Sequence, residues 1–123
     1  MTERQPVIAI VDDDEIVRRS IKRLISSLSF EVDDFASGEE FLESLSRRRP
    51  ACMLLDLHMP GLNGIEVIEA LQTRRIKIPT IIITGNTRPD TRGRCLDAGA
   101  IGYLEKPLER DVVLATIQTA TAT

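Results

Sequence analysis

Several short apolar runs of the sequence end in a side chain that could do chemistry. Adjacent carboxylates raise one another's pKa, so a fold that gathers them needs a compensating cation. Magnesium is a hard ion that proteins usually hold with one or two carboxylates, water and a phosphoryl oxygen. These residue types therefore point to a magnesium site with a lysine beside it. The residues are, in chain order, Asp12, Asp13, Asp14, Asp56, Thr84 and Lys106.

The apolar runs alternate with amphipathic stretches from Val7 onward, which indicates βαβ units and a parallel sheet. The first, third and fourth runs are continuously apolar, as in strands that helices cover on both faces. In such sheets functional groups gather beyond the carboxyl ends of the strands, so the candidate residues are expected at one edge. The predicted strands are residues 7–11, 30–35, 52–55, 80–84 and 101–104.

The stretches between the runs have apolar residues at the spacing of a helix face. The first predicted helix covers residues 15–28, with Arg18 and its basic neighbours facing water. Ser37 and Glu40 fit a capping box at the start of the second helix, and the third helix follows Asn63. The residues expected to face the core are Val17, Ile21, Leu24, Ile25, Leu28, Phe41, Leu42, Leu45, Ile65, Ile68, Leu71, Val113, Ile117 and Ala120.

The fourth helix, over about residues 90–98, has the weakest pattern. Gly93 lies inside it and costs about 1 kcal/mol relative to alanine in a helix, and the segment has few large apolar residues. The threonine-rich end of the fifth helix, from Thr116, is expected to fray.

Composition limits the classes of function. The 123 residues fit one domain, which is predicted to cover residues 1–123. The apolar runs are far shorter than the roughly 20 residues of a membrane span, so a cytoplasmic chain without a membrane partner is expected. The net charge of −3 argues against direct nucleic-acid binding by this domain. Cys52 and Cys95 lie far apart and are expected in the core rather than at a zinc or redox site.

Four motifs of the sequence resemble those of the receiver domains of response regulators in two-component systems, in the same order and at the same spacing. They are VIAIVDDDE, LLDLHMPGLNG, IIITGN and AGAIGYLEKP. The chain is similar in particular to the receivers of nitrogen-fixation and nitrate-type transcription regulators, over nearly its whole length. The resemblance implies an α/β fold of the flavodoxin-like three-layer α/β/α type, with a five-stranded parallel sheet in the order 2-1-3-4-5.

The same resemblance implies how the acidic residues would act. Asp56 would be the phosphoacceptor, attacking the phosphorus of a phosphohistidine to give an aspartyl phosphate. Asp13, Asp56 and the backbone carbonyl of His58 would ligate Mg²⁺ directly. Asp12 would act mostly through a water molecule.

The resemblance also implies roles at the later strand ends. Lys106 would contact the transferring group, and Thr84 would donate its hydroxyl to a phosphoryl oxygen, so that both belong with Asp56 to the catalytic set. Tyr103 would turn inward toward the space near Thr84 and form a switch with it. Lys106-Pro107 resembles a cis peptide of the family that aims the lysine into the site.

The function implied is a signalling switch. The chain would take a phosphoryl group from a sensor histidine kinase or a small phosphodonor in a Mg²⁺-dependent reaction. The face of the fourth helix, fifth strand and fifth helix would then change and control an output, expected to be transcription. The domain would catalyse its own phosphorylation and dephosphorylation without being a classical enzyme. Ile16 is a candidate kinase contact, although capping geometry would equally explain its position.

The sequence leaves open whether the chain is a stand-alone regulator or part of a longer one. The further partners that the resemblance suggests are a C-terminal DNA-binding output domain or a downstream protein, and a second copy in a phosphorylation-dependent homodimer.

Other interpretations remain for single residues and for the whole chain. Asp14 is interpreted as a helix N-cap in preference to a ligand. Thr84 alone is a β-branched strand residue, and Tyr103 alone a half-buried aromatic. A haloacid-dehalogenase-type phosphohydrolase would use the Asp-x-Asp pattern of residues 12–14 but leaves Asp56 unexplained. A receiver that docks without accepting phosphate is disfavoured by the complete acidic set.

Overall fold

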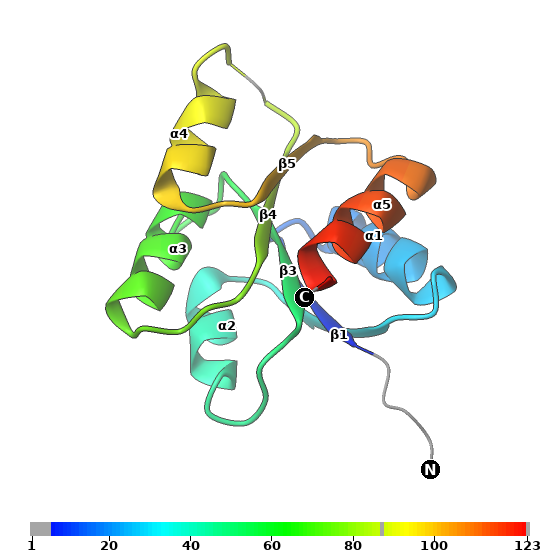
Figure 1. Ribbon diagram of the computed structural model, residues 1–123, viewed down its shortest axis with the longest axis horizontal. Helices are drawn as coiled ribbons and strands as arrows, with labels where there is room; N and C mark the ends of the chain where they lie inside the picture. The colour runs from blue at the N-terminus through cyan, green and yellow to red at the C-terminus, as the bar shows by residue number, and fades with distance from the viewer. Residues whose placement is uncertain (1–5, 87, 123) are drawn as a thin grey trace.

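Five parallel strands form the centre of the structure, a computed structural model that describes residues 6–86 and 88–122 (Figure 1). Their order in the sheet is β2-β1-β3-β4-β5, as predicted. The strands are β1 (Val7–Val11), β2 (Glu31–Phe35), β3 (Cys52–Asp56), β4 (Thr80–Thr84) and β5 (Gly102–Glu105). The helices are α1 (Glu15–Ser27), α2 (Gly38–Ser44), α3 (Gly64–Thr73), α4 (Thr91–Ala98) and α5 (Arg110–Thr121).

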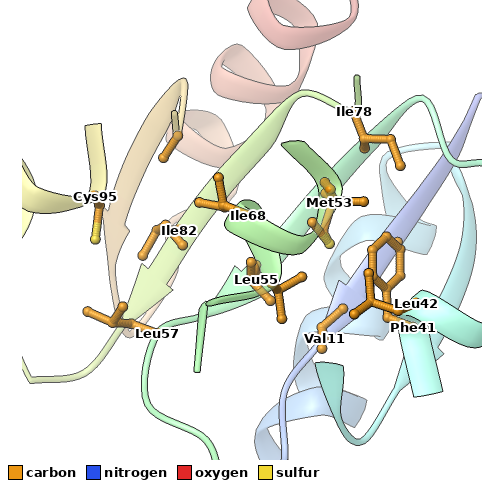
Figure 2. Close-up of a cluster of buried hydrophobic side chains, with 14 of the residues drawn as sticks. Val11, Phe41, Leu42, Met53, Leu55, Leu57, Ile68, Ile78, Ile82 and Cys95 are labelled. Carbon is orange, nitrogen blue, oxygen red and sulfur yellow. The ribbon is translucent and has the colours of Figure 1, made fainter. Parts of the chain in front are cut away.

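The helices form two layers, which confirms the predicted three-layer fold. Helices α1 and α5 cover one face of the sheet, and α2, α3 and α4 cover the other (Figure 1). Successive strand residues point to opposite faces, so β1, β3 and β4 contribute to both layers of core and are mainly apolar, with polar residues at the ends of β3 and β4. On the α2–α4 side the core includes Val11, Phe41, Met53, Leu55, Ile68, Ile82 and Cys95 (Figure 2). On the α1–α5 side it includes Ile8, Ile10, Ile21, Ile25, Leu54, Ile81, Ile83, Val113 and Ile117.

Side-chain caps begin the helices that lead away from the sheet edge. The Asp14 carboxylate accepts hydrogen bonds from two backbone N–H groups of the first turn of α1, which confirms its interpretation as an N-cap. Asn63 and Glu66 form a capping box at α3, where the sequence indicated only a turn before a helix. At α2 Ser37 accepts from the Glu40 N–H, but the Glu40 carboxylate accepts from the Ser37 hydroxyl, so the predicted reciprocal backbone bond is not made.

The observed elements differ from the predicted ones mainly at their ends. Strand β5 begins at Gly102 rather than at Ile101, which is exposed. Helix α5 runs to Thr121 where fraying was expected, and its threonine hydroxyls donate to carbonyls one turn earlier in the helix. Helix α4 is short and buries only Thr91 and Cys95, in agreement with its weak pattern. None of the helices in the described residues is long and apolar enough to cross a membrane.

The first residue of α3, Gly64, lies against the end of β3. A Cβ at this position would stand 2.9 Å from the carbonyl oxygen of Asp56 and 3.1 Å from the Cα of Leu57. Both neighbours are backbone atoms, so no side-chain rotation could relieve the contact. The absence of a side chain at residue 64 therefore allows α3 to pack directly beneath Asp56.

We expect Gly64→Ala to lower the free energy of unfolding by about 1–3 kcal/mol, because the added methyl group must displace backbone beside Asp56. Gly93→Ala is the matched control. A Cβ at Gly93 meets no described atom within 4 Å, and alanine favours a helix interior by about 1 kcal/mol, so this variant should be as stable as wild type or more stable. Urea unfolding measures both, and a similar loss of stability in the two variants would contradict the close packing at residue 64.

Candidate functional site

Three carboxylates meet at the carboxyl ends of β1 and β3. Asp12 and Asp13 follow β1, and Asp56 is the last residue of β3. The two strands are paired, with Val11 beside Leu55, so the residues that follow are neighbours as well. One carboxylate oxygen from each of Asp12, Asp13 and Asp56 lies within 4.8 Å of the other two, close enough to share a metal ion.

Lys106 reaches the carboxylates from the far side of β4. It follows β5, and its stem passes Gly85, where a Cβ would lie 3.9 Å from the Lys106 Cδ. The ammonium group donates to Asp12 Oδ2 at 2.8 Å and lies 3.4 Å from Asp56 Oδ1. Lys106 contributes one positive charge to a cluster of three carboxylates. A further cation would therefore reduce the negative charge that remains. The Lys106-Pro107 peptide is cis, as the sequence predicted.

Burial and charge both act on the ionisation of the site. Asp12 and Asp56 are buried, whereas Asp13 is exposed. Desolvation and then the charge of Asp12 raise the pKa of Asp56 from 3.8 to about 6, although Lys106 acts in the opposite direction. Desolvation lowers the pKa of Lys106, but the hydrogen bond to Asp12 and the charges of Asp56 and Asp12 outweigh it and raise that pKa. The site therefore holds a charged lysine beside a carboxylate that resists ionisation.

Every polar group of Asp12 has a partner. Its Oδ1 accepts from the Asp14 N–H at 3.0 Å, and its Oδ2 accepts from Lys106. Its N–H donates to the Phe35 carbonyl at 3.1 Å, and its carbonyl accepts from Arg18 Nη1 at 2.7 Å. The prediction that Arg18 faces water is wrong, because its side chain is only 14% exposed and turns toward the site.

The remaining candidate residues lie around this cluster. Thr84, at the end of β4, is buried, and its Oγ1 accepts from the Asn86 N–H at 3.2 Å. Tyr103 pairs with Ile82 in the β4–β5 register, so its side chain and that of Thr84 are on the same face of the sheet. Tyr103 is buried in the core on the α2–α4 side. His58 follows β3 by two residues and is exposed.

Two other predictions concern residues outside the cluster. Cys52 and Cys95 are fully buried, and burial raises the pKa of the Cys52 thiol to about 12. Both are core residues, as predicted. Ile16 is 82% exposed on the first turn of α1. It borders a mainly apolar hollow of about 450 Å³ between α1 and the segment that follows β5, which Leu24 and Leu108 also line.

Comparison with known proteins agrees with this arrangement. The family model described as the response regulator receiver domain matches residues 8–118. The chain is 34% identical over 113 residues to the transcriptional regulatory protein FixJ of Bradyrhizobium diazoefficiens, across 92% of this chain and 55% of FixJ. It is 32% identical over 120 residues to the response regulator protein TodT of Pseudomonas putida, across 98% of this chain and 53% of TodT. The chain therefore spans about half the length of these curated relatives.

Solved structures show the same fold. The crystal structure of FixJ-N superposes with a TM-score of 0.87 at 33% identity, covering 98% of this chain and 95% of that one. A response regulator receiver protein from Burkholderia phymatum gives a TM-score of 0.84 at 39% identity, covering 95% of each chain.

We expect Asp56→Asn to stabilise the protein without divalent cations, by about 1–3 kcal/mol at neutral pH. The pKa of Asp56 is raised to about 6 in the fold, so ionising this group destabilises the folded state. That cost is complete above about pH 6 and vanishes below about pH 4, where the carboxyl is protonated in both folded and unfolded chains. The gain from the variant should therefore shrink as the pH falls through this range.

Urea unfolding in a chelator at about pH 4 and about pH 7.5 measures the difference. Glu69→Gln removes an exposed carboxylate from α3 and should change stability by less than about 0.5 kcal/mol at both pH values. If Asp56→Asn gave the same gain at both, the raised pKa of Asp56 would be wrong.

Proposed function

The chain belongs to the response regulator receiver domain family of two-component systems, and from this premise we propose that Asp56 is its phosphoacceptor. The observation that supports the proposal is the position of Asp56. Its carboxylate lies at the end of β3 within reach of two further carboxylates and 3.4 Å from the Lys106 ammonium. A buried carboxylate with a raised pKa in such a cluster is typical of a functional site rather than of a structural ion pair.

The chemistry proposed for Asp56 is nucleophilic. One carboxylate oxygen attacks the phosphorus of a phosphohistidine, the phosphorus–nitrogen bond breaks, and an aspartyl phosphate forms. A pKa of about 6 leaves Asp56 mostly ionised near pH 7, so the nucleophile is present in its reactive form. Lys106 balances charge on the transferring group, since its ammonium already lies between Asp12 and Asp56.

The oxygen donors of the site fit a magnesium ion. Three carboxylates against one lysine leave uncompensated negative charge, and hard oxygen ligands suit Mg²⁺. Asp13, Asp56 and the His58 carbonyl would hold the ion, with Asp12 acting through water. When bound, the ion neutralises charge on the phosphoryl group. It would also favour the ionised form of Asp56, as any nearby cation does.

Thr84 and Tyr103 are the proposed switch. The Thr84 hydroxyl now accepts from the Asn86 N–H, and it would have to turn to donate to a phosphoryl oxygen on Asp56. That movement would alter the segment before α4. The helix buries only two residues, and Asp90 at its start makes no side-chain cap hydrogen bond within the described residues. A segment with so few buried contacts can reorganise at a modest cost in free energy.

The proposed output face consists of α4, β5 and α5. Two large apolar side chains are exposed on its helices, namely Leu96 of α4 and Val112 of α5, and Ile101 is exposed directly before β5. A shift of α4 would change what this face offers to a partner, such as a second copy of the chain, a downstream protein or a DNA-binding output domain. Because relatives such as FixJ are named as transcriptional regulators and are about twice as long, we propose that the output is transcription.

A sensor histidine kinase is the proposed phosphodonor. The exposed Ile16 and the apolar hollow beside it lie on α1 next to the segment of Lys106, so a helix docked there would be close to Asp56. In this role the domain catalyses its own phosphorylation and dephosphorylation and does not turn over a substrate as a classical enzyme does.

Incubation with acetyl phosphate and Mg²⁺ should add one acid-labile phosphoryl group to the wild-type protein and none to Asp56→Asn. The reason is that the amide cannot act as the nucleophile. Intact-mass measurement follows the reaction, with a chelator control that should abolish it. Asp97→Asn removes an exposed carboxylate from α4 and should react as wild type does. Equal incorporation into wild type and Asp56→Asn would exclude Asp56 as the acceptor.

A further inference from the structure

We propose that Arg18 is a positioning residue of the acidic site, which holds the peptide between Asp12 and Asp13 so that both carboxylates face Asp56. The inference rests on the proposed function of that site as a magnesium-dependent phosphoacceptor. It concerns a residue outside the set of strand-end groups, on the first turns of α1.

The guanidinium group of Arg18 donates two hydrogen bonds in different directions. Its Nη1 donates to the Asp12 carbonyl at 2.7 Å, and its Nε donates to Asp34 Oδ2 at 3.2 Å. Asp34 lies on β2 and also accepts from Lys22 Nζ at 3.1 Å. The Arg18 side chain is only 14% exposed, so these bonds are shielded from competition with water. Arg18 thus connects α1, β2 and the first residue after β1.

The hydrogen bond from Arg18 to the Asp12 carbonyl fixes the orientation of the whole peptide unit between Asp12 and Asp13. A peptide unit is planar, so fixing the Asp12 carbonyl also fixes the N–H of Asp13 and the direction in which the chain continues. The N–H of Asp12 is held from the other side by the Phe35 carbonyl of β2. The chain therefore leaves β1 in a set direction, and the exposed Asp13 comes within 4.8 Å of Asp12 and Asp56.

The geometry requires arginine in particular. Nε and Nη1 belong to one rigid fork, and the two bonds use different donors of it. A lysine at residue 18 would keep the charge but would have a single ammonium group, which cannot reproduce the planar fork. Arg19 is a matched comparison on the same helix. It is 73% exposed and pairs only with Glu15 among the ion pairs of the described residues.

If Arg18 acted only through its charge, its loss would have the opposite effect on Mg²⁺ binding from the loss of a positioning residue. A positive charge near a cation site repels the cation, so loss of the Arg18 charge alone would tighten Mg²⁺ binding. Loss of a residue that orients metal ligands weakens it, typically by 10- to 100-fold. We expect about tenfold weaker binding for both Arg18→Met and Arg18→Lys. Arg19→Met removes the same charge without touching the ligands and should bind Mg²⁺ no more weakly than wild type.

The test is calorimetric titration of chelator-treated protein with MgCl₂ alone, with unfolding curves to show that each variant is folded at the titration temperature. Asp13→Asn provides the reference for a lost ligand and should not bind measurably. Arg18→Lys provides the test if Arg18→Met fails to fold, because it keeps the charge and most of the stem.

Weaker binding in both Arg18 variants, with Arg19→Met unchanged, would support positioning. Tighter binding in Arg18→Met, wild-type binding in Arg18→Lys, or equal losses in the Arg18 and Arg19 variants would overturn it. If wild type and Asp13→Asn were equally unable to bind Mg²⁺, the proposed function of the site would fail and the inference would fall with it.

Discussion

The electrostatic cost of holding Asp12, Asp13 and Asp56 together is the constraint on which the site depends. Carboxylates that share a buried edge destabilise the fold unless positive charge compensates them. Lys106 supplies part of that charge, through a 2.8 Å bond to Asp12 and a 3.4 Å approach to Asp56. Desolvation and then the charge of Asp12 raise the pKa of Asp56 to about 6, and a divalent cation would relieve the part of this shift that comes from excess negative charge. The excess negative charge that lowers stability is therefore also what would attract a cation to the site.

The rest of the fold holds this cluster in place. Parallel pairing of β1 with β3 sets Asp12 beside Asp56. The first residue of α3, Gly64, packs closely against the backbone of Asp56. Asp14 caps α1 directly after the acidic pair, while Arg18 holds the Asp12 carbonyl from the same helix. These contacts are short and specific. By contrast, α4 on the opposite side of β4 buries only two residues. Thr84 therefore lies between the closely held acidic cluster and a helix that can reorganise more easily.

Features that follow from a repeating sequence pattern could be predicted from the sequence. Features that depend on a single contact between distant residues could not. The strand order, the apolar helix faces and the gathering of residues at one sheet edge follow from periodicity and from parallel topology. Arg18 was expected in water because helical periodicity places it beside basic, exposed neighbours. Its actual partners, Asp34 and the Asp12 carbonyl, come from β2 and the end of β1. The start of β5 depends on an individual backbone hydrogen bond, from the Ile101 N–H to the Thr80 carbonyl, which composition does not reveal.

Asp56 ionises against its burial and against the charge of Asp12, and a bound cation would oppose both effects by favouring the carboxylate form. The most direct test is titration of the Asp56 carboxyl carbon by NMR, first in a chelator and then with saturating Mg²⁺. We expect a pKa of about 6 for Asp56 without the cation and a clear fall when Mg²⁺ is present, because the ion favours the carboxylate form. A pKa that is unperturbed without the cation, or that Mg²⁺ leaves unchanged, would contradict it.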